Sequence, residues 1–268
     1  MSNARTTGTR GGLVLAIIMA LFALFRYYSS TEYNSVLGEK QNVALSVDQE
    51  IALGLQSAPQ MAQQYGGLHP DPKAQQYLKE VGDKIVASSV AKSSDYTFDF
   101  HLLADPQVVN AFALPGGQVF ITQALFNQLE NEDQLAGVLG HEIGHVIGRH
   151  SAQRIAKQQL AEGLSGAAVL ATYDPNNPAT TQTAQIAAVI GNLVTMKYGR
   201  EDELQSDELG VRFMSEAGYD PNAMIGVMQI LKAAAGPNRQ PEFFSSHPDP
   251  DNRIENIKTA IDKYYKGK

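Results

Sequence analysis

The stretch Leu135-Ala-Gly-Val-Leu-Gly-His-Glu-Ile-Gly-His-Val-Ile147 is an apolar helical pattern that two histidines and one glutamate interrupt. Residues four apart lie one turn apart on the same helix face, so the imidazoles of His141 and His145 can converge on one metal ion. Glu142 lies beside them, where its carboxylate can accept a proton from water. A surface helix carrying these residues by chance is a weak alternative, because burying unpaired polar groups is costly. This HExxH motif therefore predicts a metal site with a general base.

A catalytic zinc site needs a third protein ligand and an open position for water. The longer motif HExxHxxGxxH would place that ligand at Ser151, so His150 is one residue short, and we expect it to be a polar residue near the end of the helix. Glu203 and Asp207 are better candidates because they share a helix face. Glu203 can bind the metal while Asp207 accepts a hydrogen bond from a ligand imidazole. Their spacing is equally compatible with a solvated acidic face.

Three glycines, Gly140, Gly144 and Gly148, form a second four-residue periodicity in the same segment. Glycine inside a helix costs about 1 kcal/mol relative to alanine, so this line suggests that another helix approaches closely. The helix that contains Glu203 also contains Gly210, and its close approach would explain both sets of glycines.

The rest of the chain is typical of one α+β domain that is mainly helical and contains a small β-sheet. A helix capped by Ser46 should end near Gly66-Gly67, and a second should run over residues 72–88. Alternating β-formers predict strands at 96–103 and at 118–122, the latter entered through the Pro115-Gly116-Gly117 turn. Further helices are predicted over residues 133–158, 160–171, 184–196, 201–217, 221–234 and 250–265.

Composition excludes several functions. The 268 residues carry a net charge of −7, with no cluster of basic residues, which argues against a nucleic-acid partner. There is no cysteine, so disulfides, thiolate zinc sites and a cysteine nucleophile are excluded. Any metal must be bound by histidines and carboxylates.

The N-terminus predicts attachment to a membrane. Residues 11–25 carry no charge, Arg5 and Arg10 precede them, and Arg26-Tyr27-Tyr28 follows. With the tyrosines at the interface, this is a short but feasible span, and the arginines favour a cytoplasmic N-terminus. A cleaved signal peptide is the alternative. The predicted organisation is an anchor at residues 1–28, a polar linker at 29–45 and a metallopeptidase-like domain at 46–268.

Taken together, four motifs resemble those of zinc metallopeptidases of the CAAX prenyl protease type, particularly the membrane-anchored bacterial gluzincins of the BepA-like and HtpX-like branch. They are His141 to His145, Glu203-Leu-Gln-Ser-Asp207, Ser246-His247-Pro248 with Arg253, and Asn110-Ala-Phe-Ala-Leu-Pro-Gly-Gly117. The last is similar to the family segment that leads into an edge strand above the active-site cleft. The resemblance covers about residues 46–265.

The resemblance implies roles for single residues. Glu203 corresponds to the third zinc ligand, and Asp207 and Arg253 correspond to residues that support the ligands. His247 corresponds to a histidine that either binds the metal and inhibits, or stabilises the transition state. The second Glu and the Ala of the family pattern E-x-E-A-D are Gln205 and Ser206 here. Residues expected to contact substrate are Asn110, Gly117, Gln118, Val119 and Phe120.

These features predict an endopeptidase with one Zn²⁺ per chain that cleaves unfolded or misassembled envelope proteins. An extended peptide would pair with strand 118–122 as an exposed edge. The expected location is the bacterial inner membrane, single-pass, with the catalytic domain in the periplasm. One alternative is a membrane-tethered, chaperone-like binding protein with a structural zinc bound by His141, His145, Glu203 and His247. It leaves Glu142 without a role. A non-proteolytic metal hydrolase is a third option, disfavoured by the peptide-docking strand.

Overall fold

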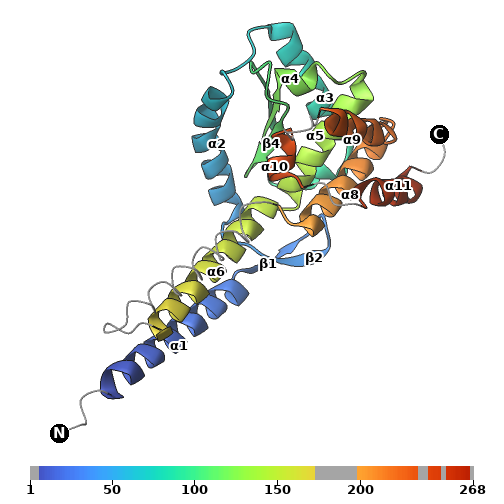
Figure 1. The fold of residues 1–268 in the computed structure, drawn as a ribbon. Coiled ribbons are helices and arrows are strands. Elements are labelled where there is room, and N and C mark those ends of the chain that lie inside the picture. The colour runs from blue at the N-terminus through green and yellow to red at the C-terminus, as the bar shows by residue number, and fades with distance from the viewer. Residues whose placement is uncertain (1–5, 173–197, 235–240, 249–251, 266–268) are drawn as a thin grey trace. The chain divides into compact units, whose positions relative to one another are not determined.

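The computed structural model describes residues 6–172, 198–234, 241–248 and 252–265. They belong to two compact units (Figure 1). The first unit consists of Met1–Asn34, Gly38–Ala44 and Ala152–Met196. The second consists of Ser35–Leu37, Leu45–Ser151 and Lys197–Lys268.

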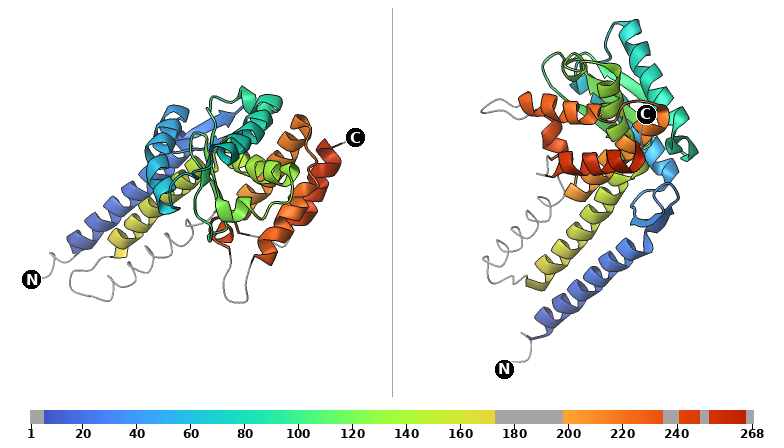
Figure 2. Two further views of the ribbon diagram at one scale, coloured as in Figure 1. Left: turned by 90° about the horizontal axis from the view of Figure 1, so that it is seen from above. Right: turned by 90° about the vertical axis from the view of Figure 1, so that its right-hand side faces the viewer.

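The first unit contains a long apolar helix and a second helix beside it. Helix α1 spans Thr6–Ser29, and the part of α6 (His150–Thr172) that belongs to this unit lies alongside it in both views of Figure 2. Gly163 on α6 allows the approach, since a Cβ there would lie 2.6 Å from the Cβ of Ala23. Within the described residues, Gly11–Ser29 is the one helical stretch long and apolar enough to cross a membrane. It suggests a membrane anchor or a signal sequence.

The segment expected to be a polar linker contains a hairpin. Strands β1 (Thr31–Asn34) and β2 (Glu39–Asn42) pair antiparallel, with Thr31 opposite Asn42. The Thr31 hydroxyl donates a hydrogen bond to Asn42 Oδ1 at 2.6 Å. The chain that follows α1 is therefore ordered up to its second strand.

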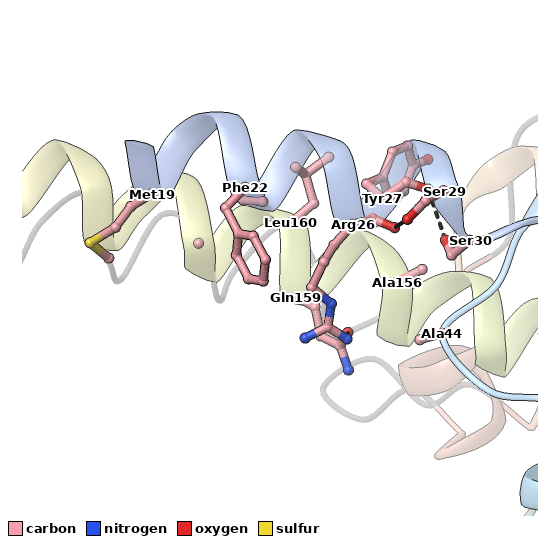
Figure 3. A pocket seen from close by; sticks show the side chains of 12 residues that line it. Met19, Phe22, Arg26, Tyr27, Ser29, Ser30, Ala44, Ala156, Gln159 and Leu160 are labelled. Carbon is pink, nitrogen blue, oxygen red and sulfur yellow. Dashed lines mark hydrogen bonds between the residues drawn. The ribbon is translucent and has the colours of Figure 1, made fainter. Parts of the chain in front are cut away.

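Helices α1 and α6 leave a cavity of about 410 Å³ between them (Figure 3). Arg26 extends across it, and its guanidinium donates a hydrogen bond to Gln159 Oε1 at 3.1 Å. The other lining residues are mostly small or apolar: Met19, Phe22, Ala23, Tyr27, Ser29, Ser30, Ala44, Ala156, Leu160 and Gly163.

The second unit contains a three-stranded sheet in the order β3-β5-β4. Its strands are β3 (Asp99–Leu103), β4 (Ala111–Leu114) and β5 (Gln118–Thr122). Strand β5 is parallel to β3 and antiparallel to β4, and all of its residues are buried. The prediction that 118–122 is an exposed edge is therefore wrong, because neighbours occupy its main-chain groups on both sides. The edge strand next to the HExxH helix is β4, which the sequence pattern did not predict.

Helices surround this sheet. Helices α2 (Val47–Gln64) and α3 (Pro72–Ser88) confirm the predicted boundaries, because Ser46 forms a capping box with Gln49 and Asp71 caps the helix that Pro72 begins. The remaining helical elements are η1 (Val90–Ser93), α4 (Gln123–Phe126), α5 (Glu132–Ile147), α8 (Arg200–Ala217), α9 (Ala223–Ala233), α10 (Phe243–Ser246) and α11 (Arg253–Tyr264). The predicted α+β class, mainly helical with a small sheet, is confirmed.

The helix predicted over residues 133–158 is interrupted. Helix α5 ends at Ile147, and Arg149 has a φ of 55°, in the left-handed region that a non-glycine residue adopts at a cost. Helix α6 begins at His150 and includes the segment predicted separately at 160–171. The helix predicted at 184–196 lies outside the described residues.

Helices α5 and α8 pack closely, as the glycine pattern predicts. A Cβ on Gly140 would lie 3.3 Å from the Cα of Gly210, and one on Gly144 would lie 2.9 Å from the carbonyl oxygen of Ser206. Position 148 favours glycine for a different reason, because a Cβ there would lie 2.4 Å from Nε2 of His150 and not against α8. The close approach brings the acidic residues of α8 to the histidines of α5.

We expect Gly144→Ala to destabilise the protein, because the added methyl group meets the backbone of Ser206 rather than a flexible side chain. Overpacking of this kind costs ~1–3 kcal/mol, more than the ~1 kcal/mol that alanine gains by helix propensity. Thermal unfolding would measure the difference. The control is Gly166→Ala, whose Cβ would lie 3.6 Å from Met19 Cε, an ordinary contact. Equal melting temperatures for both variants would contradict the prediction.

Candidate metal centre

Helix α5 positions both histidines and the glutamate of the HExxH motif inside the protein. Asn131 caps the helix by accepting a hydrogen bond from the backbone N–H of Gln134. Every residue from Gln134 to Ile147 is buried. The motif therefore lies on a helix that is surrounded by protein, and its polar groups must be paired within the structure.

Helix α8 supplies two carboxylates. Glu203 and Asp207 are buried, with 0% and 1% of their surfaces exposed, whereas Glu201 at the start of the helix is exposed. The interpretation of Glu203 and Asp207 as a solvated acidic face is therefore wrong. Two buried carboxylates need compensating positive charge.

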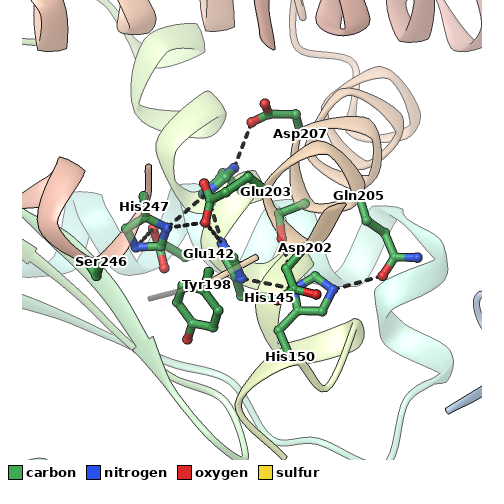
Figure 4. A network of polar contacts seen from close by, with 12 residues as sticks. Glu142, His145, His150, Tyr198, Asp202, Glu203, Gln205, Asp207, Ser246 and His247 are labelled. Carbon is green, nitrogen blue, oxygen red and sulfur yellow. Dashed lines mark hydrogen bonds and ion pairs between the residues drawn. The ribbon is translucent and has the colours of Figure 1, made fainter. Parts of the chain in front are cut away.

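Four side chains meet at one point, and Figure 4 labels three of them, His145, Glu203 and His247. Candidate ligand atoms of His141, His145, Glu203 and His247 all lie within 4.8 Å of one another. Nε2 of His141 and Nε2 of His145 are 3.0 Å apart, and the two oxygens of Glu203 lie 3.5 Å and 3.4 Å from them respectively. Zn–N and Zn–O bonds of about 2.0–2.1 Å in a tetrahedral site separate ligand atoms by about 3.3 Å. These residues therefore fit a zinc ion.

His247 completes the cluster from the other side. It follows α10, and its Nδ1 lies 3.2 Å from Glu203 Oε1 and 3.4 Å from His141 Nε2. Its ring stacks on Phe243 with centroids 4.4 Å apart, and none of its surface is exposed. The loop is held in place because the N–H of Tyr198 donates to the carbonyl of Ser246. His247 is therefore in contact with the candidate ligands.

Glu142 is a fully buried carboxylate with few partners. Within the described residues, neither of its oxygens accepts a hydrogen bond, and Oε1 lies 3.7 Å from Nε2 of His247. Burial raises the pKa of Glu142, and the nearby histidines oppose that shift. A buried, unsatisfied carboxylate beside a cluster of candidate ligands fits a group that handles a proton.

Asp207 and Arg253 support His141 from behind. Nδ1 of His141 lies 2.9 Å from Asp207 Oδ1, and Arg253 donates to both Asp207 oxygens at 2.7 Å. A third guanidinium nitrogen of Arg253 lies 3.2 Å from Glu203 Oε2. Burial alone would raise the pKa of Asp207, but Arg253 and His141 hold it below its usual value. Asp207 is therefore an anion that can accept the Nδ1 proton of His141.

The two motif histidines differ in their electrostatics. Burial would lower the pKa of His141, but hydrogen bonds to Asp207 and Glu203 raise it to about 9. Burial lowers the pKa of His145 well below its usual value, despite the hydrogen bond to Glu203. Burial would also raise the pKa of Glu203, yet the charge of His247 and the two motif histidines hold it well below its usual value.

His150 is a residue whose position sequence reasoning missed. Instead of lying at the end of a helix, it begins α6 with 1% of its surface exposed. Its Nδ1 lies 2.9 Å from Nδ1 of His145, and its Nε2 lies 2.8 Å from Gln205 Oε1. The left-handed conformation of Arg149 changes the direction of the chain between α5 and α6, and no local sequence signal predicted this conformation.

The residues expected to contact substrate lie on and around the sheet. Val119 and Phe120 are central in β5, and Gln118 Oε1 lies 2.9 Å from His101 Nε2. Gly117 adopts a φ of 107° in the turn before β5. Asn110, just before edge strand β4, donates to the hydroxyl of Tyr65 at 3.2 Å. Of this set, Asn110 adjoins the edge strand, and those in β5 are enclosed.

Comparison with known proteins identifies relatives. A family model described as Peptidase family M48 matches residues 72–261. The beta-barrel assembly-enhancing protease of Yersinia pestis is 33% identical over 233 residues, covering 85% of this chain and 47% of the relative. The Escherichia coli (strain K12) protein of the same name is 31% identical over 241 residues, with the same two shares. The mitochondrial metalloendopeptidase OMA1 of Schizosaccharomyces pombe is 29% identical, covering 86% of this chain and 66% of the relative. The chain thus spans about half the length of the bacterial relatives.

Proposed function

The chain belongs to peptidase family M48, and from this premise we propose that it is a zinc-dependent endopeptidase. The observation that carries the proposal is the approach of Glu203 to within 3.4–3.5 Å of Nε2 on both motif histidines. His141, His145 and Glu203 would hold the zinc ion, and the buried Glu142 lies next to them in the chain. This is the ligand set of a catalytic site of the His₂Glu type.

The chemistry divides between the metal and the side chains. When bound, zinc supplies Lewis acidity, which lowers the pKa of water and polarises a peptide carbonyl. Glu142 accepts the proton of the attacking water and returns it to the leaving amine. Its raised pKa makes the carboxylate a stronger base than an exposed glutamate. Asp207 accepts a hydrogen bond from Nδ1 of His141, so that Nε2 is the ring nitrogen that would bind the metal.

We propose that substrates pair with strand β4. Among the described residues, its only strand partner is β5, which leaves the other edge without one. An extended peptide can add to such an edge through main-chain hydrogen bonds, with little dependence on its side chains. This mode suits unfolded or misassembled chains. Envelope proteins are the proposed class, because two of the relatives are beta-barrel assembly-enhancing proteases.

The proposed location is the inner membrane, with α1 as a single span and the peptidase in the periplasm. Arg5 and Arg10 before the apolar stretch favour this orientation.

The chain lacks cysteine, so the reactivity of one introduced thiol would show on which side of the membrane the peptidase lies. In spheroplasts, Lys92→Cys should react with a membrane-impermeant maleimide. Protection until the membrane is lysed would contradict the orientation.

We expect His247→Ala to increase cleavage several-fold. Nδ1 of His247 lies 3.2 Å from Glu203 and 3.4 Å from His141, so His247 occupies the position that a catalytic site leaves open for water. Removing its ring frees that position while three ligands remain. Casein hydrolysis and bound zinc would be measured beside Ser245→Ala, an exposed neighbour. A fall in cleavage with zinc retained would show that His247 assists the reaction instead.

A second candidate function rests on the same cluster of His141, His145, Glu203 and His247. These four buried side chains can complete a structural zinc site, and the protein would then be a membrane-tethered, chaperone-like binder.

The experiment that separates the two functions uses the full-length chain purified in detergent. Zinc content per chain and casein cleavage would be followed with and without a chelator. About one zinc per chain and chelator-sensitive cleavage support the peptidase. Bound zinc with no cleavage, even in His247→Ala, supports the binder.

A further inference from the structure

His150 packs behind a candidate zinc ligand, on the side away from the metal cluster. Its Nδ1 lies 2.9 Å from Nδ1 of His145, and its Nε2 lies 2.8 Å from Oε1 of Gln205 (Figure 4). The hydroxyl of Ser206 lies 3.2 Å from the same Nδ1. Both Gln205 and Ser206 belong to α8, the helix that also carries Glu203.

A neutral imidazole carries one proton, so one ring nitrogen donates and the other accepts. His145 directs Nε2 toward His141 and Glu203, so binding a metal there leaves its proton on Nδ1. The partner of that proton is Nδ1 of His150, which must then accept. The proton of His150 therefore resides on Nε2 and is donated to Gln205 Oε1. The binding of a metal by Nε2 of His145 therefore determines the tautomers of both His145 and His150.

The opposite arrangement is disfavoured by Gln205. If Nδ1 of His150 donated to His145, then Nε2 of His150 would present a lone pair to the carbonyl oxygen of Gln205, 2.8 Å away. Two acceptors at that distance repel each other. His145 would also carry its proton on Nε2, where it faces the cluster and could not bind a metal. With its amide oxygen toward Nε2 of His150, Gln205 therefore favours the metal-binding tautomer of His145.

We propose that His150 is a positioning residue that, together with Gln205, fixes His145 in its metal-binding tautomer. This inference rests on the proposed zinc site. His141 and His145 are thus oriented by different means: an aspartate ion-paired to Arg253 for the first, and a neutral histidine–glutamine relay for the second. Gln205 and Ser206, which depart from the family pattern E-x-E-A-D, both lie within hydrogen-bond distance of His150.

The first test is the zinc affinity of the full-length chain, by competition with a chromophoric chelator. His150→Leu should weaken binding about 10–100-fold, the usual effect of removing a partner of a metal-ligating histidine. His150→Asn retains an acceptor near the position of Nδ1, and should stay within a few-fold of wild type. Gln205→Met should weaken binding, whereas Gln205→Glu should retain it. The absorption spectrum of the cobalt-substituted protein should change with His150→Leu and not with His150→Asn.

Wild-type affinity in His150→Leu would overturn the inference. Equal losses in His150→Leu and His150→Asn would also overturn it, since packing would then be the cause. Histidine-selective ¹⁵N NMR of the zinc-loaded wild type avoids any folding defect: protons on His145 Nδ1 and His150 Nε2 are expected, and a proton on His150 Nδ1 would refute the inference. A wild-type chain that binds no zinc would overturn this inference and the proposed function together. Zinc bound through this relay without cleavage would contradict the peptidase alone.

Discussion

The Glu142→Gln variant is expected to bind zinc like the wild-type chain and to lose peptide cleavage by about 10²–10⁴-fold, the range that a general base contributes. Glutamine has the shape of glutamate but cannot accept the proton of the attacking water. The metal should be unaffected, because Glu142 is absent from the group of candidate ligands. Single-turnover cleavage of casein by zinc-saturated protein would measure the loss.

The control is Glu255→Gln, the same change at an exposed position on α11. It should leave cleavage unchanged. Substantial cleavage by zinc-loaded Glu142→Gln would show that Glu142 is not the general base and that another residue has this role. Loss of zinc together with loss of cleavage would instead make Glu142 part of the metal site.

The same variant should be more stable than wild type when metal-free. Because burial raises the folded-state pKa of Glu142, the folded protein loses stability as pH rises above the ordinary glutamate value of 4.5. Glutamine carries no charge, so the variant escapes this loss. Urea unfolding of the metal-free proteins should show a higher midpoint for Glu142→Gln at pH 7, and the difference should shrink near pH 4. A midpoint below wild type at pH 7 would contradict the pKa direction.

The sequence predicted those parts of the fold that depend on local chemistry. Ser46 caps a helix as predicted, and α3 begins at Pro72 as predicted, because helix starts depend on neighbouring residues. The glycines at 140, 144 and 210 predicted the α5–α8 contact, because helix spacing determines which residues can approach another backbone.

Two other predictions that needed non-local information failed. Strand 118–122 lies at the centre of its sheet because β3 and β4 pair with it on its two sides. His150 was expected at the end of a helix, whereas the left-handed Arg149 ends α5 and aims that imidazole back at His145. His150 and Gln205 are 55 residues apart in the sequence, and they come into contact only when α5 and α8 pack together.

Arg253→Met is expected to lower the unfolding free energy of the metal-free protein by ~3–5 kcal/mol, the usual cost of removing one partner of a buried ion pair. The guanidinium is buried and pairs with both Asp207 and Glu203. Methionine fills much of the space but leaves two buried carboxylates close together. Loss of this size is a large part of the 5–15 kcal/mol that typically stabilises a domain.

Zinc should restore part of the lost stability. Its positive charge would compensate the carboxylate of Glu203, but the carboxylate of Asp207 would still lack the charge of Arg253. The stabilisation by zinc should therefore be larger in Arg253→Met than in wild type, while its metal-bound form stays less stable than the wild-type metal-bound form. Urea unfolding with and without zinc would measure all four states. Lys258→Met, an exposed change on the same helix, is the control and should lie within about 0.5 kcal/mol of wild type. An Arg253→Met chain as stable as this control when metal-free would mean that the two carboxylates are neutralised by protonation instead of by the arginine.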